Sequence, residues 1–172
     1  MEQAALLINW SLDRRRAPLL IAAFSIIVVG SAISSEVFGG LAPCVLCLYQ
    51  RIPYAITIVL GLVGFAAPRL LLPALVLAAL AFLTGGGIAV FHVGVEQAWW
   101  QGTEACVGAQ NKAASLDELR AQIMATPVVR CTDIQWSLFG ISMAGYNVLT
   151  SLGLAVFSLL AARRNFGGQG TS

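Results

Sequence analysis

Charged residues are scarce in this sequence. Asp, Glu, Lys and Arg make up only 10% of the 172 residues, whereas a typical soluble domain contains about 25%. Neither a basic patch for nucleic acid nor a glycine-rich loop for phosphate is present. Because 58% of the residues are hydrophobic and no Pro/Ser-rich linker divides the chain, we interpret residues 1–172 as a single integral membrane domain.

Four stretches are apolar enough to cross a bilayer, which requires about 20 residues each. They cover residues 17–35, 45–67, 70–91 and 134–162. Arg51 is the one charged residue inside them. The first stretch is not expected to be a cleaved signal peptide, because it is long and no small-residue cleavage site precedes a polar mature chain. The sequence therefore predicts an all-α membrane protein, a bundle of four transmembrane helices.

Positive charge sets the expected orientation of the bundle. Six of the ten Lys and Arg residues lie beside helix ends that alternate to one side: Arg14, Arg15, Arg16, Arg69, Arg163 and Arg164. The positive-inside rule makes this side cytoplasmic, together with both termini. A short loop over 36–43 and a long, net acidic loop over 92–133 then lie on the opposite side.

All four cysteines of the chain are predicted to lie on that opposite side. Cys44 and Cys47 stand at the start of the second span, and Cys106 and Cys131 belong to the long loop. Four cysteines allow three pairings. The C-x-x-C spacing favours Cys44 with Cys47, which leaves Cys106 with Cys131.

The two pairs differ in how well they would serve as structural staples. Closing the ring from Cys106 to Cys131 would stabilise the fold by about 3.5 kcal/mol, against about 2 kcal/mol at most for Cys44 to Cys47. The loop pair therefore fits a structural role as well as a chemical one. The C-x-x-C pair fits redox chemistry better: if Pro43 occupies the first helical position, both sulfurs lie at the positive end of the helix dipole, which lowers a thiol pKa.

Arg51 follows Cys47 by four residues and shares its helix face. A cation inside a span is costly, so a functional role is the first hypothesis: the charge would stabilise a thiolate or an anionic acceptor. The alternative is that the side chain reaches the lipid headgroups. Zinc binding is disfavoured, because Cys106 and Cys131 have no neighbouring Cys or His.

Two motifs together carry a family resemblance. "PCVLCLYQR" at the mouth of the second span, with a later loop cysteine pair followed by "QWSLFGISM", resembles the disulfide bond formation protein B family of bacterial inner membranes over roughly residues 17–162. The resemblance implies a periplasmic location for the four cysteines. It also implies a thiol:quinone oxidoreductase whose partner is a periplasmic thioredoxin-fold dithiol oxidase.

The same resemblance implies the roles of the cysteines. Cys106 would form the mixed disulfide with the partner, Cys131 would attack Cys44, and Cys47 would face the quinone. Arg51 would hold a quinone oxygen. Ubiquinone is expected in preference to menaquinone, although no residue identifies the quinone type, and no metal or flavin is required.

Further residues are assigned with alternatives. His92, the single histidine, follows the predicted third span and would either donate to a quinone oxygen or serve as an interfacial anchor. Trp99 and Trp100 fit an interfacial aromatic belt, and "TGGG" at 84–87 fits close helix packing. A capping box from Ser115 to Glu118 predicts a short amphipathic helix on the membrane surface or packed on the bundle.

Two rival functions remain open. One is a structural or adaptor membrane protein with two stapling disulfides. The other is a family variant that serves a dedicated partner, which the sequence cannot distinguish because the partner surface lies in the loop.

Overall fold

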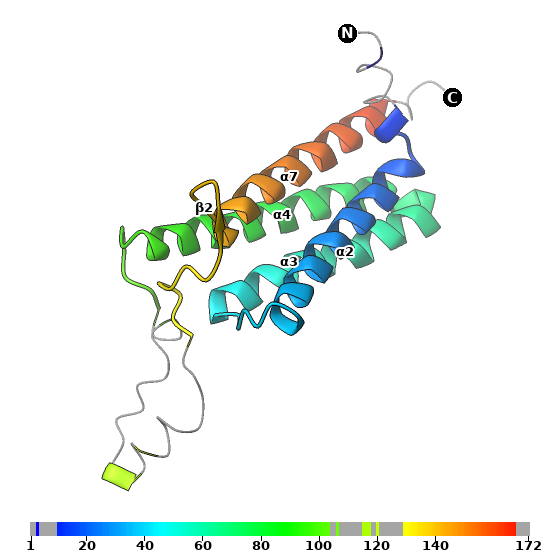
Figure 1. Ribbon diagram of the computed structural model, residues 1–172. Helices are drawn as coiled ribbons and strands as arrows, with labels where there is room; N and C mark the ends of the chain where they lie inside the picture. Colours follow the sequence, from blue (N-terminus) through cyan, green and yellow to red (C-terminus); the bar gives the residue numbers. More distant parts are fainter. Residues whose placement is uncertain are drawn as a thin grey trace.

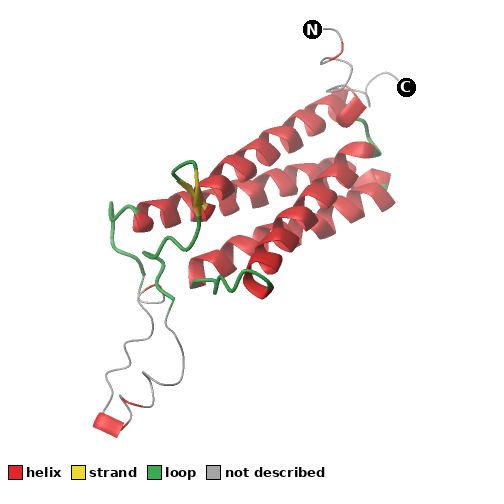
Figure 2. Cartoon of the chain, viewed as in Figure 1, coloured by secondary structure: helices red, strands yellow, loops and turns green. Residues whose placement is uncertain are grey.

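The computed structural model describes residues 3, 10–103, 106, 115–117, 120 and 129–167. Four long helices run side by side as a bundle (Figure 1): α2 (Arg16–Val37), α3 (Val45–Ala66), α4 (Leu71–Glu96) and α7 (Met143–Gly167). A 3-10 turn, η1 (Pro68–Leu70), joins α3 to α4, and a small antiparallel hairpin of β1 (Ser137–Leu138) and β2 (Ile141–Ser142) precedes α7 (Figure 2). All four helices are long and apolar enough to cross a membrane, so the predicted all-α bundle is confirmed.

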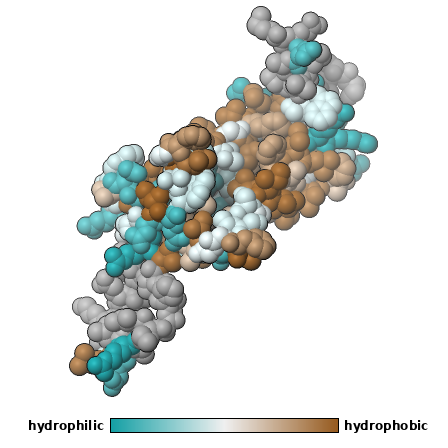
Figure 3. Space-filling model, in the orientation of Figure 1, coloured by the Kyte–Doolittle hydropathy of each residue, from teal (hydrophilic) through white to brown (hydrophobic). Residues whose placement is uncertain are grey.

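Apolar side chains cover the outside of the bundle as well as its interior. Most of each spanning segment faces outward rather than into the protein, and the space-filling view shows hydrophobic residues over the helices with hydrophilic residues towards both ends (Figure 3). An apolar surface of this kind is stable against lipid. A helix can lie in lipid because its backbone polar groups are satisfied within the helix. The chain is therefore a multi-pass membrane protein.

Small residues bring the helices close together in the half of the bundle away from the cysteines. A side chain at Gly61 would place its Cβ 2.5 Å from the carbonyl oxygen of Pro18, so α2 and α3 touch through backbone. A Cβ at Gly85 of the "TGGG" stretch would lie 3.2 Å from the Pro53 side chain, and one at Gly86 would lie 3.4 Å from the Cβ of Ser151, whereas nothing lies within 4 Å of one at Gly87. The predicted close packing is thus confirmed for Gly85 and Gly86 but not for Gly87.

The largest buried cluster, here called the bundle core, fills this half. Its members are aliphatic or aromatic side chains from all four helices and the segment before α2: Leu12, Ala17, Ile21, Tyr54, Leu71, Leu75, Ala78, Phe82, Leu154, Ala155, Ala161 and Ala162. The helix ends that carry Arg16, Arg69 and Arg164 lie beyond this core. The cysteines lie at the opposite end of the bundle (Figure 1).

Three predicted boundaries are wrong. The fourth helix begins at Met143 rather than at 134, because Phe139 and Gly140 take positive φ angles of 50° and 77° and turn the chain into the hairpin. The third helix continues to Glu96, so His92 lies inside it rather than after it. The first helix continues to Val37 and includes Glu36, which the sequence had placed in a loop.

The start of α3 also differs from the prediction. The helix begins at Val45, and Cys44 is its N-cap residue with an extended backbone (φ −75°, ψ 170°), so Pro43 lies outside the helix. The sulfur of Cys44 accepts a hydrogen bond from the backbone N–H of Cys47, and an N-cap residue does this for the helix it opens. The predicted amphipathic helix after Ser115 falls largely outside the described residues.

Candidate active site

The four cysteines lie together at one end of the bundle, in what we call the sulfur cluster. Cys44, Cys106 and Cys131 are buried and pack with Leu46 and Val95, and the half-buried Cys47 lies against them. The four thiols are unbonded in the structure. Two are supplied by the start of α3 and two by the segment between α4 and α7, so the fold brings together pairs that are far apart in the sequence.

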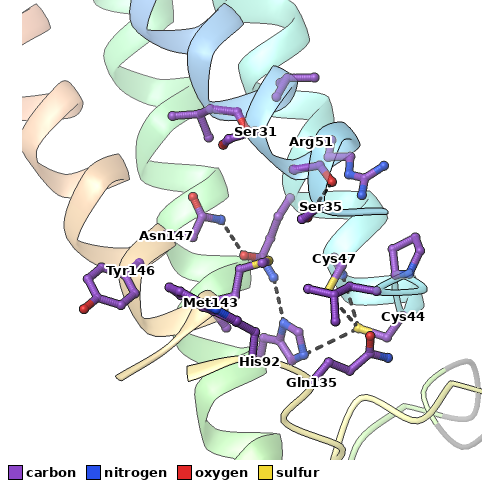
Figure 4. Close-up of a pocket in the computed structure, with 18 of the residues that line it drawn as sticks. Ser31, Ser35, Cys44, Cys47, Arg51, His92, Gln135, Met143, Tyr146 and Asn147 are labelled. Atoms are coloured by element: carbon purple, nitrogen blue, oxygen red, sulfur yellow. Dashed lines mark hydrogen bonds between the residues drawn. The ribbon is translucent and has the colours of Figure 1, made fainter. Parts of the chain in front are cut away.

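Cys44 and Cys47 are placed by the first turn of α3. Their sulfurs lie 3.2 Å apart (Figure 4), a close contact that the C-x-x-C spacing produces at a helix start. The backbone N–H of Cys47 lies 3.4 Å from the Cys44 sulfur. The Cys44 side chain therefore receives hydrogen bonds at the end of the helix where partial positive charge collects.

Cys131 lies between Cys106 and the pair formed by Cys44 and Cys47. Its backbone N–H donates to the carbonyl oxygen of Cys106 at 3.2 Å, and its thiol interacts with the thiols of both Cys106 and Cys44. Thr103 donates to the sulfur of Cys106 at 3.4 Å. The arrangement permits thiol–disulfide exchange between the loop pair and the helix pair, because one sulfur has neighbours in both.

The surroundings give the sulfurs different affinities for a proton. The hydrogen bond from the Cys47 side chain lowers the pKa of Cys44 to about 4, with a smaller contribution from His92, although burial opposes this. Burial raises the pKa of Cys131 above its ordinary value, and the neighbouring Cys106 thiol adds to the effect. Negative charge within the cluster is therefore favoured on Cys44 and disfavoured on Cys131.

A cavity of about 500 Å³ opens beside Cys44 and Cys47 between the helices. Its wall is largely apolar, with residues from α2, α3, α4 and α7, and the polar groups Arg51, His92 and Glu96 lie along it. Arg51 lies among the residues that line the cavity (Figure 4). Its Nη1 forms an ion pair with Oε2 of Glu36 on α2 at 2.9 Å. The Glu36 carboxylate partly neutralises the charge that the sequence analysis assigned to a thiolate or an acceptor.

His92 contacts the sulfur cluster directly. Its Nε2 lies 3.5 Å from the Cys44 sulfur and 3.8 Å from Oε1 of Glu96, one turn further along α4. Its Nδ1 lies 2.9 Å from the side-chain amide of Gln50 on α3. The histidine is thus buried and held on both ring nitrogens, which a surface anchor would not be.

Comparison with known proteins agrees with this geometry. The family model "Disulfide bond formation protein DsbB" matches residues 14–161. A disulfide bond formation protein B of Dechloromonas aromatica is 31% identical over 84% of this chain and 88% of its own length. One of Haemophilus influenzae is 30% identical over 86% of both chains. The chain belongs to the DsbB family.

Other comparisons add less. A protein of Rickettsia prowazekii described as uncharacterized is 27% identical over 81% of this chain. No solved structure gives a significant match. DsbB membership makes the chain a membrane protein of disulfide formation.

The sequence analysis of this DsbB-family chain missed five polar residues around the cysteines. They are Glu36, Gln50, Tyr54, Glu96 and Asn147, and each one contacts another polar side chain in the structure. All five lie within the four helices that are long and apolar enough to cross a membrane. Polar side chains inside an apolar run were the available signal, because such groups are costly in lipid and need partners.

Three of the same atoms have the spacing of a metal site. The sulfurs of Cys44 and Cys47 and a ring nitrogen of His92 lie within 4.8 Å of one another. Thiolate and imidazole are ligands that zinc accepts, and a structural zinc site has four ligands. The geometry alone does not separate a metal site from a redox site, so the proposed function needs a test that does.

Proposed function

We propose that this protein reoxidises a periplasmic thioredoxin-fold dithiol oxidase and passes the two electrons to a membrane quinone. The observation that carries the proposal is the position of Cys131, whose thiol interacts with both Cys106 and Cys44, next to a cavity lined by Cys47, Arg51 and His92. The proposed setting is a bacterial inner membrane with both termini in the cytoplasm and the sulfur cluster on the periplasmic side.

The thiol–disulfide exchange steps need no external oxidant. The quinone is needed only afterwards, to return Cys44 and Cys47 to a disulfide. A thiolate of the reduced partner attacks Cys106 of a Cys106–Cys131 disulfide, and Cys131 leaves as a thiolate. Cys131 then attacks Cys44 of a Cys44–Cys47 disulfide, and Cys47 leaves as a thiolate. The second partner thiolate releases Cys106, which attacks Cys131, restores the loop disulfide and expels Cys44 as a thiolate.

The lowered pKa of Cys44 favours the last of these steps. A thiol with a low pKa is a good leaving group in disulfide exchange, and the pKa of Cys44 is lowered to about 4. The raised pKa of Cys131 makes its thiolate a strong nucleophile once it is formed. The two pKa shifts together direct electrons from the loop pair to the helix pair.

The cavity fits a quinone ring. It is apolar over most of its wall, with few polar groups, which is the usual character of a small-molecule site, and its volume of about 500 Å³ is within the range of such sites. A bound quinone would take two electrons from the Cys44 and Cys47 thiolates as their disulfide forms again, and its two protons would come from solution. Arg51 would hold a ring oxygen, whereas both ring nitrogens of His92 face the side chains of Cys44 and Gln50. Ubiquinone is the proposed acceptor.

A trapping experiment tests the partner end. In a Cys131→Ser variant, the Cys106 thiolate can attack the disulfide of the oxidised partner and form a mixed disulfide, and no Cys131 thiol is present to resolve it. We expect a covalent adduct with a small thioredoxin-fold protein on non-reducing gels. Cys106 is only 3% exposed, so accessibility to a small alkylating reagent is measured in parallel; an accessible Cys106 without any adduct contradicts the partner assignment.

A kinetic experiment tests the quinone end. Arg51→Ala should raise the quinone KM about tenfold, the value of one charge-assisted hydrogen bond, whereas Glu36→Gln should not raise it because the arginine remains. An unchanged KM in Arg51→Ala contradicts the role given to this residue.

Two rival functions predict different results. A structural protein with two staples would keep its disulfides in mild reductant and reduce no quinone. A metal site at Cys44, Cys47 and His92 would retain stoichiometric zinc through purification. Replacing any one of the three residues would release the zinc. Metal analysis of the purified wild-type protein separates that case from the redox relay.

A further inference from the structure

A line of polar side chains, all buried except the half-buried Asn147, crosses the bundle from α7 to the sulfur cluster. The hydroxyl of Tyr54 donates to Oδ1 of Asn147 at 2.5 Å. The Asn147 amide donates to Oε1 of Gln50, a contact drawn as a dashed line in Figure 4. The Gln50 amide in turn lies 2.9 Å from Nδ1 of His92. The line joins α3, α4 and α7 and runs along the wall of the cavity.

The His92 end of this line determines the direction of its hydrogen bonds. Nε2 of His92 faces the sulfur of Cys44 at 3.5 Å and a carboxylate oxygen of Glu96 at 3.8 Å. Both are acceptors when ionised, so Nε2 must carry a proton to interact favourably with either. Nδ1 of a neutral ring is then bare and accepts from Gln50.

Each side-chain amide has one donor and one acceptor, so the orientation of one amide determines the orientation of the next. If Gln50 donates to His92, its oxygen accepts from Asn147, and the Asn147 oxygen accepts from the hydroxyl of Tyr54. Every described contact is satisfied in this direction. Among the described residues, no buried side-chain nitrogen or oxygen lacks a partner, so a reversal at one residue would have to reverse its neighbours.

Glu96 is fixed independently of this line. Its Oε2 accepts from the hydroxyl of Ser142 at 2.5 Å, and Ser142 belongs to the hairpin that precedes α7. The carboxyl is therefore held beside Nε2 by a separate part of the fold. This second contact supports the same ring state that Gln50 supports from the opposite side.

We propose that Gln50 and Asn147 are positioning residues that hold His92 with its proton on Nε2, directed at the sulfur of Cys44. The neutral ring then donates a hydrogen bond to the Cys44 thiolate when that sulfur is expelled. The catalytic consequence rests on the proposed relay, in which Cys44 is a leaving group. The ring state itself does not depend on turnover and can be measured separately.

The chain offers a single-residue probe, because His92 is its one histidine. We would label the full-length, reduced protein with ¹⁵N-histidine in membrane nanodiscs and record long-range ¹H–¹⁵N correlations, which distinguish a protonated ring nitrogen from a bare one. We expect the wild-type protein to show a protonated Nε2 and a bare Nδ1.

Two variants change the donor that faces Nδ1. Gln50→Glu replaces the amide donor with a carboxylate of similar shape, and we expect Nδ1 to gain a proton. Gln50→Met removes the donor at similar size, and we expect the ring to populate both neutral forms. Ser151→Ala is the matched control. Ser151 contacts Tyr54 at 2.9 Å and donates to Oδ1 of Asn147 at 3.3 Å, but it leaves the donor that faces Nδ1 in place, so the wild-type spectrum should persist.

The outcomes separate this proposal from the proposed function. A wild-type ring protonated on Nδ1, or wild-type spectra in both Gln50 variants, overturns the positioning role. Where the ring state changes, quinone reduction by the reduced partner should fall about tenfold, as expected for a lost hydrogen bond to a charged group. Unchanged turnover in such a variant overturns the role in catalysis, whereas a wild-type protein that reduces no quinone contradicts only the relay.

Discussion

The two ends of this helix bundle have cores of different kinds. The bundle core consists of alanine, leucine and aromatic side chains that determine how closely the helices approach. The sulfur cluster at the other end consists of thiols that contact a histidine, backbone amides and one another. The bundle core determines how the helices pack, and the sulfur cluster determines where a proton and an electron pair reside. Substitutions in the bundle core should therefore change stability, and substitutions in the sulfur cluster should change reactivity.

The largest expected effect separates the two cysteine pairs within the sulfur cluster. We expect Cys44→Ser to abolish quinone reduction with every electron donor, because Cys47 alone cannot form the Cys44–Cys47 disulfide. Cys106→Ser should abolish activity with the protein partner but retain it with dithiothreitol, which can reduce the Cys44–Cys47 disulfide directly. Stopped-flow measurement of quinone absorbance provides the readout.

The order of the relay depends on this difference between donors. If Cys106→Ser is inactive with dithiothreitol as well, the loop pair is part of the quinone-reducing unit and not only its supplier. Thermal stability of both variants is measured alongside, and we expect it to remain near the wild-type value because neither residue belongs to the bundle core.

A second prediction concerns the proton affinity of Cys44. The Cys47 side chain is the main cause of the lowered pKa, so Cys47→Ala should raise the pKa of Cys44 towards its ordinary value. The thiolate exists above the pKa, which means that at pH 6 the wild-type sulfur is mostly ionised and the variant sulfur mostly protonated. We expect alkylation of Cys44 at pH 6 to slow at least about tenfold, measured by peptide mass mapping.

Cys106→Ala is the matched control for this experiment. Cys106 contacts Thr103 and Cys131 and is not among the groups that shift the pKa of Cys44, so the pH profile of Cys44 alkylation should keep its midpoint. An equal shift in both variants would mean that general packing of the cluster, rather than the Cys47 hydrogen bond, lowers the pKa.

The sequence was sufficient for the features that depend on neighbouring residues. Uninterrupted apolar runs gave four helices, since each needs about 20 residues to cross a bilayer. The spacing of Cys44 and Cys47 predicted two sulfurs at a helix start, and the structure places them 3.2 Å apart. The start of α7 was missed because an apolar run such as 134–142 forms a hairpin as readily as a helix.

The contacts that could not be predicted join residues on different helices. Gln50 and Asn147 are 97 positions apart, and nothing near either residue specifies the other as its partner. Arg51 was identified as functional, but its ion pair with Glu36 depends on how α2 packs against α3. Such pairings depend on how the helices pack, and small residues such as Gly61 allow α2 and α3 to approach closely.

The smallest expected effect tests the bundle core. A Cβ at position 61 would lie 2.5 Å from the Pro18 carbonyl oxygen and 3.0 Å from the Ala22 Cβ, so Gly61→Ala must separate α2 from α3. We expect a loss of about 1–3 kcal/mol in the free energy of unfolding, the usual cost of overpacking, seen as a lower Tm in detergent. Turnover of the folded protein should stay near the wild-type value.

Gly87→Ala is the control for that prediction, because nothing lies within 4 Å of a Cβ built there. Alanine has a higher helix propensity than glycine by about 1 kcal/mol, so this variant should be as stable as the wild type or slightly more stable. If Gly61→Ala instead reduced turnover strongly while leaving the Tm unchanged, the two cores would not be separable. The rotation of α3 set at Gly61 would then also control the position of Gln50 and Cys47 in the sulfur cluster.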